Sequence, residues 1–381
     1  MKEIYLDHSA TTPLLPCAAR AVAEAMSENW YNPSALYAPA VRAAGHLKEA
    51  RRTLARALGA REDEIFFHSG GTEGVNTAIY GALGKRIGKS EMIISGVEHA
   101  AGHRAAQAAE AMGARVTWIA PEADGTISPS AVADAVTEET RLVSVMHVNN
   151  ETGALNDIAA IARAVKSVNP RTIVHSDGVQ AFMRIPFSVA SSGVDIYTVS
   201  GHKIGAPRGI GATYLRKGTP FVPTLIGGGQ ESDLRSGTEN AAGAAGLAAA
   251  AEHWAATVGE RLEKQETIRT RMIAALSDLP DLMIHACGPH SPYILSISAR
   301  GVRGETVLHL LEAEGILIGT GSACHSRHKG SRVLQQMGVP AEYMEGTVRL
   351  SFPLAADFED FDTVIAAYRE AIEKLRHFGR K

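Results

Sequence analysis

Short apolar segments alternate with segments of helical periodicity between residues 65 and 215, and this alternation constrains the fold more than any other feature. The strand-like segments are 65–68, 92–95, 115–119, 142–147, 172–175, 195–199 and 211–215. Strands that alternate with helices predict a mostly parallel sheet with helices on both faces. We therefore expect an α/β fold built on a mostly parallel seven-stranded sheet.

A second, smaller α+β domain is predicted after this series of strands. The alanine-rich stretch 241–256 leads into a charged helix at 259–276, and we interpret the stretch as a connector. The later strand-like and helical segments are 282–285, 293–297, 304–314, 347–352 and 358–377.

Composition excludes several classes of function. The 381-residue chain has a net charge of -3, so no general attraction to nucleic acid or to an anionic membrane is expected. No apolar run approaches the roughly 20 residues that a membrane-spanning helix needs. The three cysteines are odd in number and far apart, which argues for a reducing compartment rather than a disulfide framework. We expect a cytoplasmic protein with no direct nucleic-acid or membrane partner.

Polar and charged residues gather just after the strand-like segments. They are Thr72, His99, Asn150, Asp177 and Lys203. Ligands of open α/β sheets bind beyond the carboxyl ends of the strands, so these residues are expected to share one site. A Schiff-base lysine and a carboxylate that pairs with a pyridinium nitrogen are what pyridoxal phosphate (PLP) requires. The alternatives are a surface lysine and an aspartate that caps a following helix.

The segment Ser69–Thr72 lies between a strand and a helix and reads Ser-Gly-Gly-Thr. Small residues and free N–H groups at a helix N-terminus form a phosphate cradle, which makes Gly71 and Thr72 candidates. An ordinary helix N-cap is the alternative. Ser200 and His202 are placed to add phosphate donors, and Gln180 could reach the phenolic oxygen of the cofactor.

A cysteine and an arginine complete the candidate chemistry. Cys324 lies in a small, polar, basic stretch, in which Arg327 and Lys329 favour the thiolate. Arg349 is a charge within a strand pattern, which a bidentate grip on a substrate carboxylate would explain. A structural ion pair is the alternative for Arg349.

The histidine pair His99 and His103, and the histidine near Cys324, could suggest a metal site. His99 and His103 lack the full His-Glu-x-x-His pattern, and Cys324 with His328 lacks a second ligand pair, so no metal is expected. We interpret His99 as a group that stacks on the cofactor ring and transfers protons, with a purely structural histidine as the alternative.

These segments together resemble the cysteine desulfurase family, which belongs to the class V aminotransferase group of fold-type I PLP enzymes. The resemblance rests on motifs that follow one another at 5–13, 32–34, 69–73, 98–99, 147–153, 175–177, 200–203, 235–238 and 321–324. It implies a homodimer with active sites at the subunit interface. It also implies a large PLP-binding domain over 15–252 and a small domain, formed by 1–14 and 253–381, that carries the cysteine loop.

The resemblance implies a role for each candidate residue. The residues that would bind the cofactor are Gly71, Thr72, Asn150, Asp177, Gln180, Ser200, His202, Lys203 and, from the neighbouring subunit, Thr238. Those that would orient the substrate amino acid are Asn32, Asn150 and Arg349. Those that would carry the chemistry are His99, Lys203 and Cys324.

The implied reaction removes sulfur from L-cysteine. Lys203 would take the α-proton, and the Cys324 thiolate would attack the sulfur and keep it as a persulfide. L-Alanine would leave, and the persulfide would pass to an acceptor or scaffold protein for iron–sulfur cluster assembly or tRNA thiolation. The alternatives are a selenocysteine lyase, another class V aminotransferase or lyase activity, and a sulfur carrier that mainly binds a scaffold protein.

Overall fold

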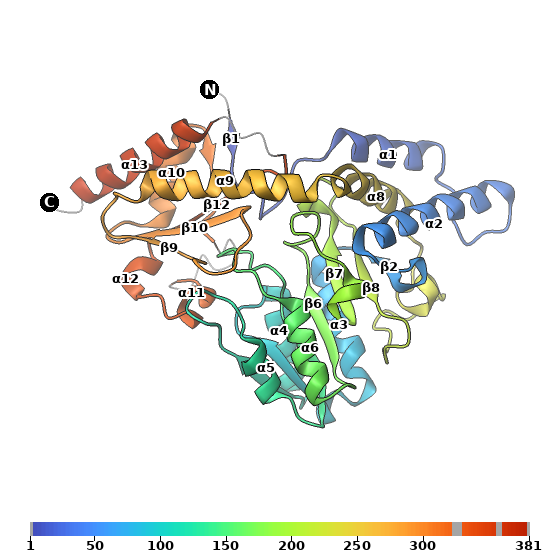
Figure 1. Cartoon of the computed structure of the whole chain (residues 1–381). Coiled ribbons are helices and arrows are strands. Elements are labelled where there is room, and N and C mark those ends of the chain that lie inside the picture. The colour runs from blue at the N-terminus through green and yellow to red at the C-terminus, as the bar shows by residue number, and fades with distance from the viewer. Residues whose placement is uncertain (1–2, 322–329, 356–359, 379–381) are drawn as a thin grey trace.

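A seven-stranded sheet organises the first two thirds of the chain in the computed structural model, which describes residues 3–321, 330–355 and 360–378 (Figure 1). Its strands are β2 (Ile65–His68), β3 (Glu91–Ser95), β4 (Arg115–Ile119), β5 (Thr140–Ser144), β6 (Ile173–Asp177), β7 (Ile196–Ser200) and β8 (Gly211–Leu215). Their order is β2-β8-β7-β6-β5-β3-β4. Only β8 runs antiparallel to its neighbours, so the prediction of a mostly parallel sheet is confirmed.

Helices cover both faces of this sheet. They are α1 (Pro16–Ser27), α2 (Ala38–Leu58), α3 (Gly71–Leu83), α4 (Ala100–Ala111), α5 (Pro129–Ala135), α6 (Ile158–Val168), α7 (Val189–Ser192) and α8 (Ala241–Ala255). Successive strand residues point to opposite faces, and both faces are apolar. Ile93 packs in a core with α2, α6 and α8, whereas Met92 and Ile94 pack in a second core with α3 and α4.

The carboxyl ends of β3, β5, β6 and β7 lie at one edge of the sheet because these strands are parallel. β2 ends at the same edge, since two successive antiparallel pairings through β8 restore its direction. The candidate residues therefore emerge together at this edge, as the connectivity of an α/β sheet predicts.

The smaller unit has its own sheet and core. Its elements are α9 (Val258–Leu276), β9 (Leu282–Ile284), β10 (Ile294–Ala299), α10 (Gly304–Ala313), β11 (Ile316–Leu317), α11 (Arg332–Gln336), α12 (Ala341–Met344), β12 (Thr347–Ser351) and α13 (Phe361–Phe378). β9, β10 and β12 form an antiparallel sheet, which α9, α10 and α13 help to bury (Figure 1). The predicted connector is the helix α8, which packs on α1 and α2.

The N-terminal segment joins both units. β1 (Ile4–Tyr5) pairs in parallel with β11, and Leu6 is buried in the core of the small unit. The chain then crosses to the large unit, where the Thr12 N–H donates to the carbonyl of His202 at 3.0 Å. Residues 7–12 thus lie over the sheet edge. Among the described residues, no helix is long and apolar enough to cross a membrane.

Candidate active site

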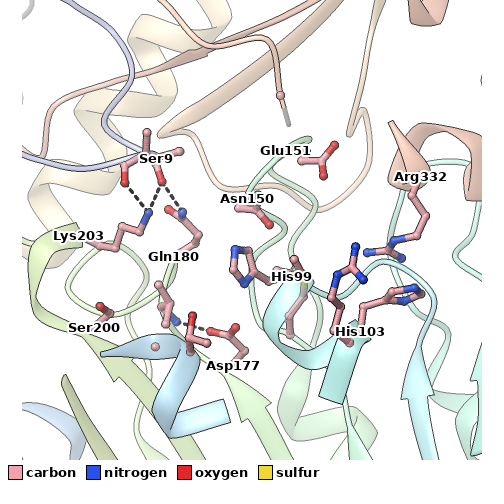
Figure 2. Close-up of a pocket in the computed structure, with 18 of the residues that line it drawn as sticks. Ser9, His99, His103, Asn150, Glu151, Asp177, Gln180, Ser200, Lys203 and Arg332 are labelled. Atoms are coloured by element: carbon pink, nitrogen blue, oxygen red, sulfur yellow. Dashed lines mark hydrogen bonds between the residues drawn. The ribbon is translucent and has the colours of Figure 1, made fainter. Parts of the chain in front are cut away.

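A cavity of about 540 Å³ lies at this edge of the sheet, which is a usual size for a cofactor or ligand pocket. Most of the candidate residues line it (Figure 2). They are Gly71, Thr72, His99, Asn150, Asp177, Gln180, Ser200, His202, Lys203 and Arg349. Strands from distant parts of the sequence therefore bring one set of side chains together.

Lys203 ends a single 3-10 turn that follows β7. Its Nζ donates hydrogen bonds to the carbonyl oxygens of Ser9 at 2.5 Å and Ala10 at 2.8 Å (Figure 2). Burial, with smaller contributions from two nearby arginines, lowers the pKa of Lys203 from 10.5 to about 7. A large share of this lysine is therefore neutral amine near pH 7, the form that attacks a carbonyl.

Asp177 is the last residue of β6 and is only 5% exposed. Its Oδ1 accepts a hydrogen bond from the Val179 N–H at 2.9 Å, and the chain continues as a turn, so the helix-capping alternative is wrong. Burial raises the pKa of Asp177, although His99 and Lys203 oppose the shift. A cationic N–H group placed against this carboxylate would stabilise its charged form.

His99 caps the N-terminus of α4, where its Nδ1 accepts from the Ala101 N–H at 3.2 Å. Burial lowers the pKa of His99, so the neutral ring is favoured. Because Nδ1 is an acceptor, the proton of the neutral ring lies on Nε2. The ring is thus both a structural cap and a wall of the cavity.

Glu98, next to His99 in the sequence, is 1% exposed and does not itself line the cavity. Its Oε1 accepts hydrogen bonds from the Ser95 hydroxyl and the Met146 N–H, both at 2.6 Å, and its Oε2 has no hydrogen-bond partner among the described residues. Burial raises the pKa of Glu98 to about 8, so it is a neutral acid at pH 7.

The phosphate side of the cavity is built from the start of α3 and the end of β7. The backbone at Gly70 has a φ of 151°, which L side chains rarely adopt, and a Cβ on Gly71 would lie 2.9 Å from Val179 Cγ2. The first N–H groups of α3 have no acceptor within the helix. Ser200 is buried, and the pKa of His202 is lowered to about 4, mainly by burial.

Gln180 connects the sheet edge to the N-terminal segment. Its Nε2 donates to the carbonyl of Ser9 at 2.9 Å, while its Oε1 accepts from Arg184 at 2.7 Å. No residue that the structure describes accepts the second hydrogen of the amide group, which leaves it available to a ligand.

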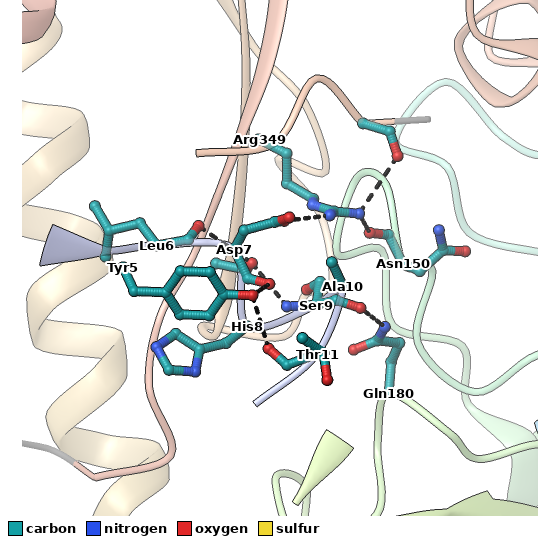
Figure 3. A network of polar contacts seen from close by, with 12 residues as sticks. Tyr5, Leu6, Asp7, His8, Ser9, Ala10, Thr11, Asn150, Gln180 and Arg349 are labelled. Carbon is teal, nitrogen blue, oxygen red and sulfur yellow. Dashed lines mark hydrogen bonds and ion pairs between the residues drawn. The ribbon is translucent and has the colours of Figure 1, made fainter. Parts of the chain in front are cut away.

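Arg349, in β12, is 5% exposed and lies at the cavity wall. Its Nη2 is 2.6 Å from Asp7 Oδ1, and its Nη1 donates to the carbonyls of Asn150 at 2.7 Å and Gly321 at 3.3 Å (Figure 3). The ion pair that the sequence left as an alternative does form. A role toward a substrate carboxylate stays a prediction.

Three predicted residues are not brought into the cavity of a single chain. Asn32 is exposed in the connection between α1 and α2, where its Oδ1 accepts from the Ser34 N–H at 2.9 Å. Thr238 is also exposed and does not line the cavity. Cys324 lies outside the described residues.

Some parts of the cavity wall were not predicted. The carbonyls of Ser9 and Ala10 face Lys203, and Arg332, at the start of α11, donates to the carbonyls of Gly96 and Glu98. A backbone acceptor leaves no signal in residue type, although the motif at 5–13 marked this segment.

The donor set fits PLP. A lysine amine that is substantially neutral near pH 7, a buried carboxylate with no ion pair among the described residues, and a small-residue turn at a helix N-terminus correspond to its aldehyde, ring nitrogen and phosphate. The fold and the site define a PLP-dependent enzyme of fold-type I.

The profile of the family "Aminotransferase class-V" matches residues 4–364. Cysteine desulfurase IscS of Methanosarcina thermophila is 36% identical over 383 residues, which cover 99% of this chain and 94% of the relative. A cysteine desulfurase of Nostoc sp. is 36% identical over 379 residues, with 99% and 94% covered. The chain therefore belongs to the class-V aminotransferase family and, within it, to the cysteine desulfurases.

Solved structures agree with this assignment. A NifS-like protein superposes with a TM-score of 0.90 at 31% identity, over 99% of this chain and 100% of the other. SspA, solved in complex with cysteine, superposes with a TM-score of 0.82 at 29% identity, over 92% and 99% of the two chains.

Proposed function

We propose that this chain removes sulfur from L-cysteine, releases L-alanine and holds the sulfur as a persulfide on Cys324. The observation that carries the proposal is the pairing of a depressed-pKa Lys203 with a buried Asp177 at one cavity, in a chain whose full-length relatives are cysteine desulfurases. The complex of SspA with cysteine supports the same substrate for this chain.

The residues of the cavity divide the work of binding the cofactor. Lys203 anchors it covalently, Asp177 pairs with the ring nitrogen, and Gln180 reaches the phenolic oxygen. His99 covers the ring. The start of α3, with Thr72, Ser200 and His202, holds the phosphate. When bound, PLP supplies an electron sink for the electron pair released at the substrate Cα.

A second group of residues would bind and orient the substrate amino acid. Arg349 and Asn150 orient the amino acid, and Asn32 would join them only across a subunit boundary, since it is remote from the cavity of its own chain. Lys203, once its amine is free, moves the proton at Cα because its pKa of about 7 permits both protonation states.

The sulfur transfer balances without a further reagent. The Cys324 thiolate forms an S–S bond as the substrate Cβ–S bond breaks, and the electron pair of that bond stays with the carbon skeleton. Two protons then convert the skeleton to alanine, so the sum is L-cysteine plus a thiol giving L-alanine plus a persulfide. The described chain reaches the cavity wall at Gly321, three residues before Cys324 in the sequence, which supports this role.

A homodimer and a downstream acceptor complete the proposal. Large apolar side chains are exposed on and near the α1–α2 connection and near residue 226, including Trp30 at 66%, Leu36 at 95% and Ile226 at 87%. Apolar exposure of this kind marks a protein contact surface. A second subunit on this surface would bring in Thr238, and a cytoplasmic acceptor for iron–sulfur cluster assembly or tRNA thiolation would take the persulfide.

The test follows sulfide and alanine together from PLP-loaded protein with L-cysteine and a thiol reductant. Equal amounts are expected, with both lost in Cys324→Ser while the bound-PLP absorbance band remains. Sulfide release by Cys324→Ser at the rate of the wild type would contradict the proposal. Release of selenium from L-selenocysteine without activity on L-cysteine would instead identify the chain as a selenocysteine lyase. Sedimentation that gives a monomer would contradict the dimer.

A further inference from the structure

A second cavity, of about 350 Å³, opens on the phosphate side of the active site. The two cavities share Ala10, Gly71, Thr72, Ser200 and His202. Arg208 lines only the second cavity, and no role was predicted for it. The phosphate cradle therefore has a cation on its outer side.

Arg208 is connected to the cradle through one hydroxyl. Its Nη2 lies 3.5 Å from Thr11 Oγ1, which is 3.1 Å from Nδ1 of His202. Arg208 is exposed, and no carboxylate among the described residues pairs with it. Its charge is therefore not neutralised within the described part of this chain.

The backbone holds Arg208 beside the cradle. The loop that contains it closes on Gly201, whose N–H donates to Ile210 at 3.0 Å and whose carbonyl accepts from Ala206 at 3.1 Å. Gly209 follows Arg208 with a φ of 80°, a left-handed conformation that turns the chain back into β8. Because Gly201 lies between Ser200 and His202, the cradle and the Arg208 loop form one local unit.

The predicted phosphate ligands of this chain carry no full positive charge. Thr72 and Ser200 are neutral, and His202 is neutral at pH 7 because burial, with Lys203 and Arg208 nearby, lowers its pKa to about 4. Lys203 is engaged as the covalent anchor. The N-terminus of α3 contributes only about half a charge.

An anion also lines the second cavity. Although burial opposes ionisation, hydrogen bonds from Arg235 and Ser69 hold the pKa of Glu73 below its usual value. Arg235 neutralises Glu73 through an ion pair of 2.8 Å and so is already engaged. Among the described residues that line the second cavity, Arg208 is the one cation left for a phosphate that carries close to two negative charges.

We propose that Arg208 is a further phosphate-binding residue, whose guanidinium supplies the positive charge that the neutral cradle lacks. The inference rests on the proposed PLP function. An arginine suits this role because its planar guanidinium stays charged and matches the geometry of phosphate oxygens.

The test measures dissociation constants of PLP and of pyridoxal, which lacks the phosphate, for the PLP-free protein. Arg208→Gln is expected to weaken PLP binding roughly 10- to 100-fold, the range of a charge-assisted hydrogen bond, and to leave pyridoxal binding unchanged. Arg208→Lys keeps the charge and should lose less. Arg163→Gln, which changes an exposed arginine of α6, is the matched control.

Three outcomes would overturn the inference. They are an unchanged PLP constant in Arg208→Gln, equal weakening of PLP and pyridoxal, and weakening of the dimer alone in sedimentation. Added salt should weaken PLP binding more in the wild type than in Arg208→Gln, since screening acts on the removed charge. Failure of the wild type to bind PLP would instead contradict the proposed function, so the two failures are distinguishable.

Discussion

The carboxylate of Asp7 lies 2.6 Å from the guanidinium of Arg349 and ties the N-terminal segment to a strand near the other end of the chain. The next residues of the same segment accept hydrogen bonds from Lys203 and Gln180. Residues 7–10 therefore contact both Lys203, the predicted anchor of the cofactor (Figure 2), and Arg349, the predicted anchor of the substrate (Figure 3). The positions of Lys203 and Arg349 therefore both depend on the N-terminal segment.

Asp7→Asn should destabilise the protein because it leaves the buried Arg349 charge without its anionic partner. We expect the free energy of unfolding to fall by roughly 1–3 kcal/mol, less than for a fully buried pair because Asp7 is partly exposed. Urea unfolding measures this. Glu305→Gln breaks the exposed pair with Arg303 and should change little, and equal effects of the two substitutions would contradict the prediction.

PLP capture by the PLP-free protein should depend on pH with a midpoint near 7. Burial lowers the pKa of Lys203 to about 7, and only the neutral amine attacks the aldehyde. The rate should rise about tenfold per pH unit below the midpoint and level off above it. Stopped-flow absorbance measures this rate. A midpoint above pH 9 would show an ordinary solvated lysine.

Asp7→Asn provides a second check on the same amine. Asp7 raises the pKa of Lys203 whereas Arg349 lowers it, so loss of the Asp7 charge should move the midpoint to lower pH. A shift of the midpoint to higher pH would contradict the prediction that Asp7 raises the pKa of Lys203.

The stability of Glu98→Gln relative to the wild type, measured as the free energy of unfolding, should increase as pH rises from 4.5 to 8. The pKa of Glu98 is raised from 4.5 to about 8, so in this window the unfolded chain has lost a proton that the folded chain keeps. Wild-type stability therefore falls with pH, by up to about 1.4 kcal/mol per unit, and the amide removes this slope. Denaturant midpoints at pH 5, 6.5 and 8 should diverge in favour of Glu98→Gln, and parallel curves would contradict the prediction.

Gly71→Ala should weaken PLP binding several-fold because the new Cβ would lie 2.9 Å from Val179 Cγ2. Valine is stiff at χ1 and cannot simply rotate away. The double variant Gly71→Ala/Val179→Ala should recover part of the loss relative to Val179→Ala alone. Equilibrium dialysis measures the constants, and additive losses would show that the contact with Val179 is not the cause.

The strand and helix pattern was sufficient to predict the large sheet. Apolar runs at Met92 and Leu142 are buried on both faces, and that burial is what a continuous hydrophobic segment encodes. The grouping of His99, Asp177 and Lys203 followed from the same pattern, because parallel strands end at one edge. The hydrogen-bond partners of these side chains, which are backbone groups of other residues, could not be read from the sequence.

The missed features depend on backbone atoms and on chain crossings. The two-residue strands β1 and β11 are too short for a periodic signal, and the carbonyls of Ser9 and Ala10 are available to Lys203 only because the N-terminal segment crosses between units. Asn32 was expected beside the substrate from the family motif alone. Its place outside the cavity of a single chain depends on the path between α1 and α2, which residue types do not determine.

Intact-mass spectrometry of the PLP-loaded protein, after brief exposure to L-cysteine without reductant, tests the proposed chemistry most directly. We predict a mass gain of one sulfur atom on the wild type, mapped to Cys324 by peptide analysis and absent from Cys324→Ser and Lys203→Ala. Alanine should appear in equal amount. Alanine formation without added sulfur on the protein, or added sulfur that persists in Cys324→Ser, would contradict the assignment of Cys324 as the residue that takes sulfur from the substrate.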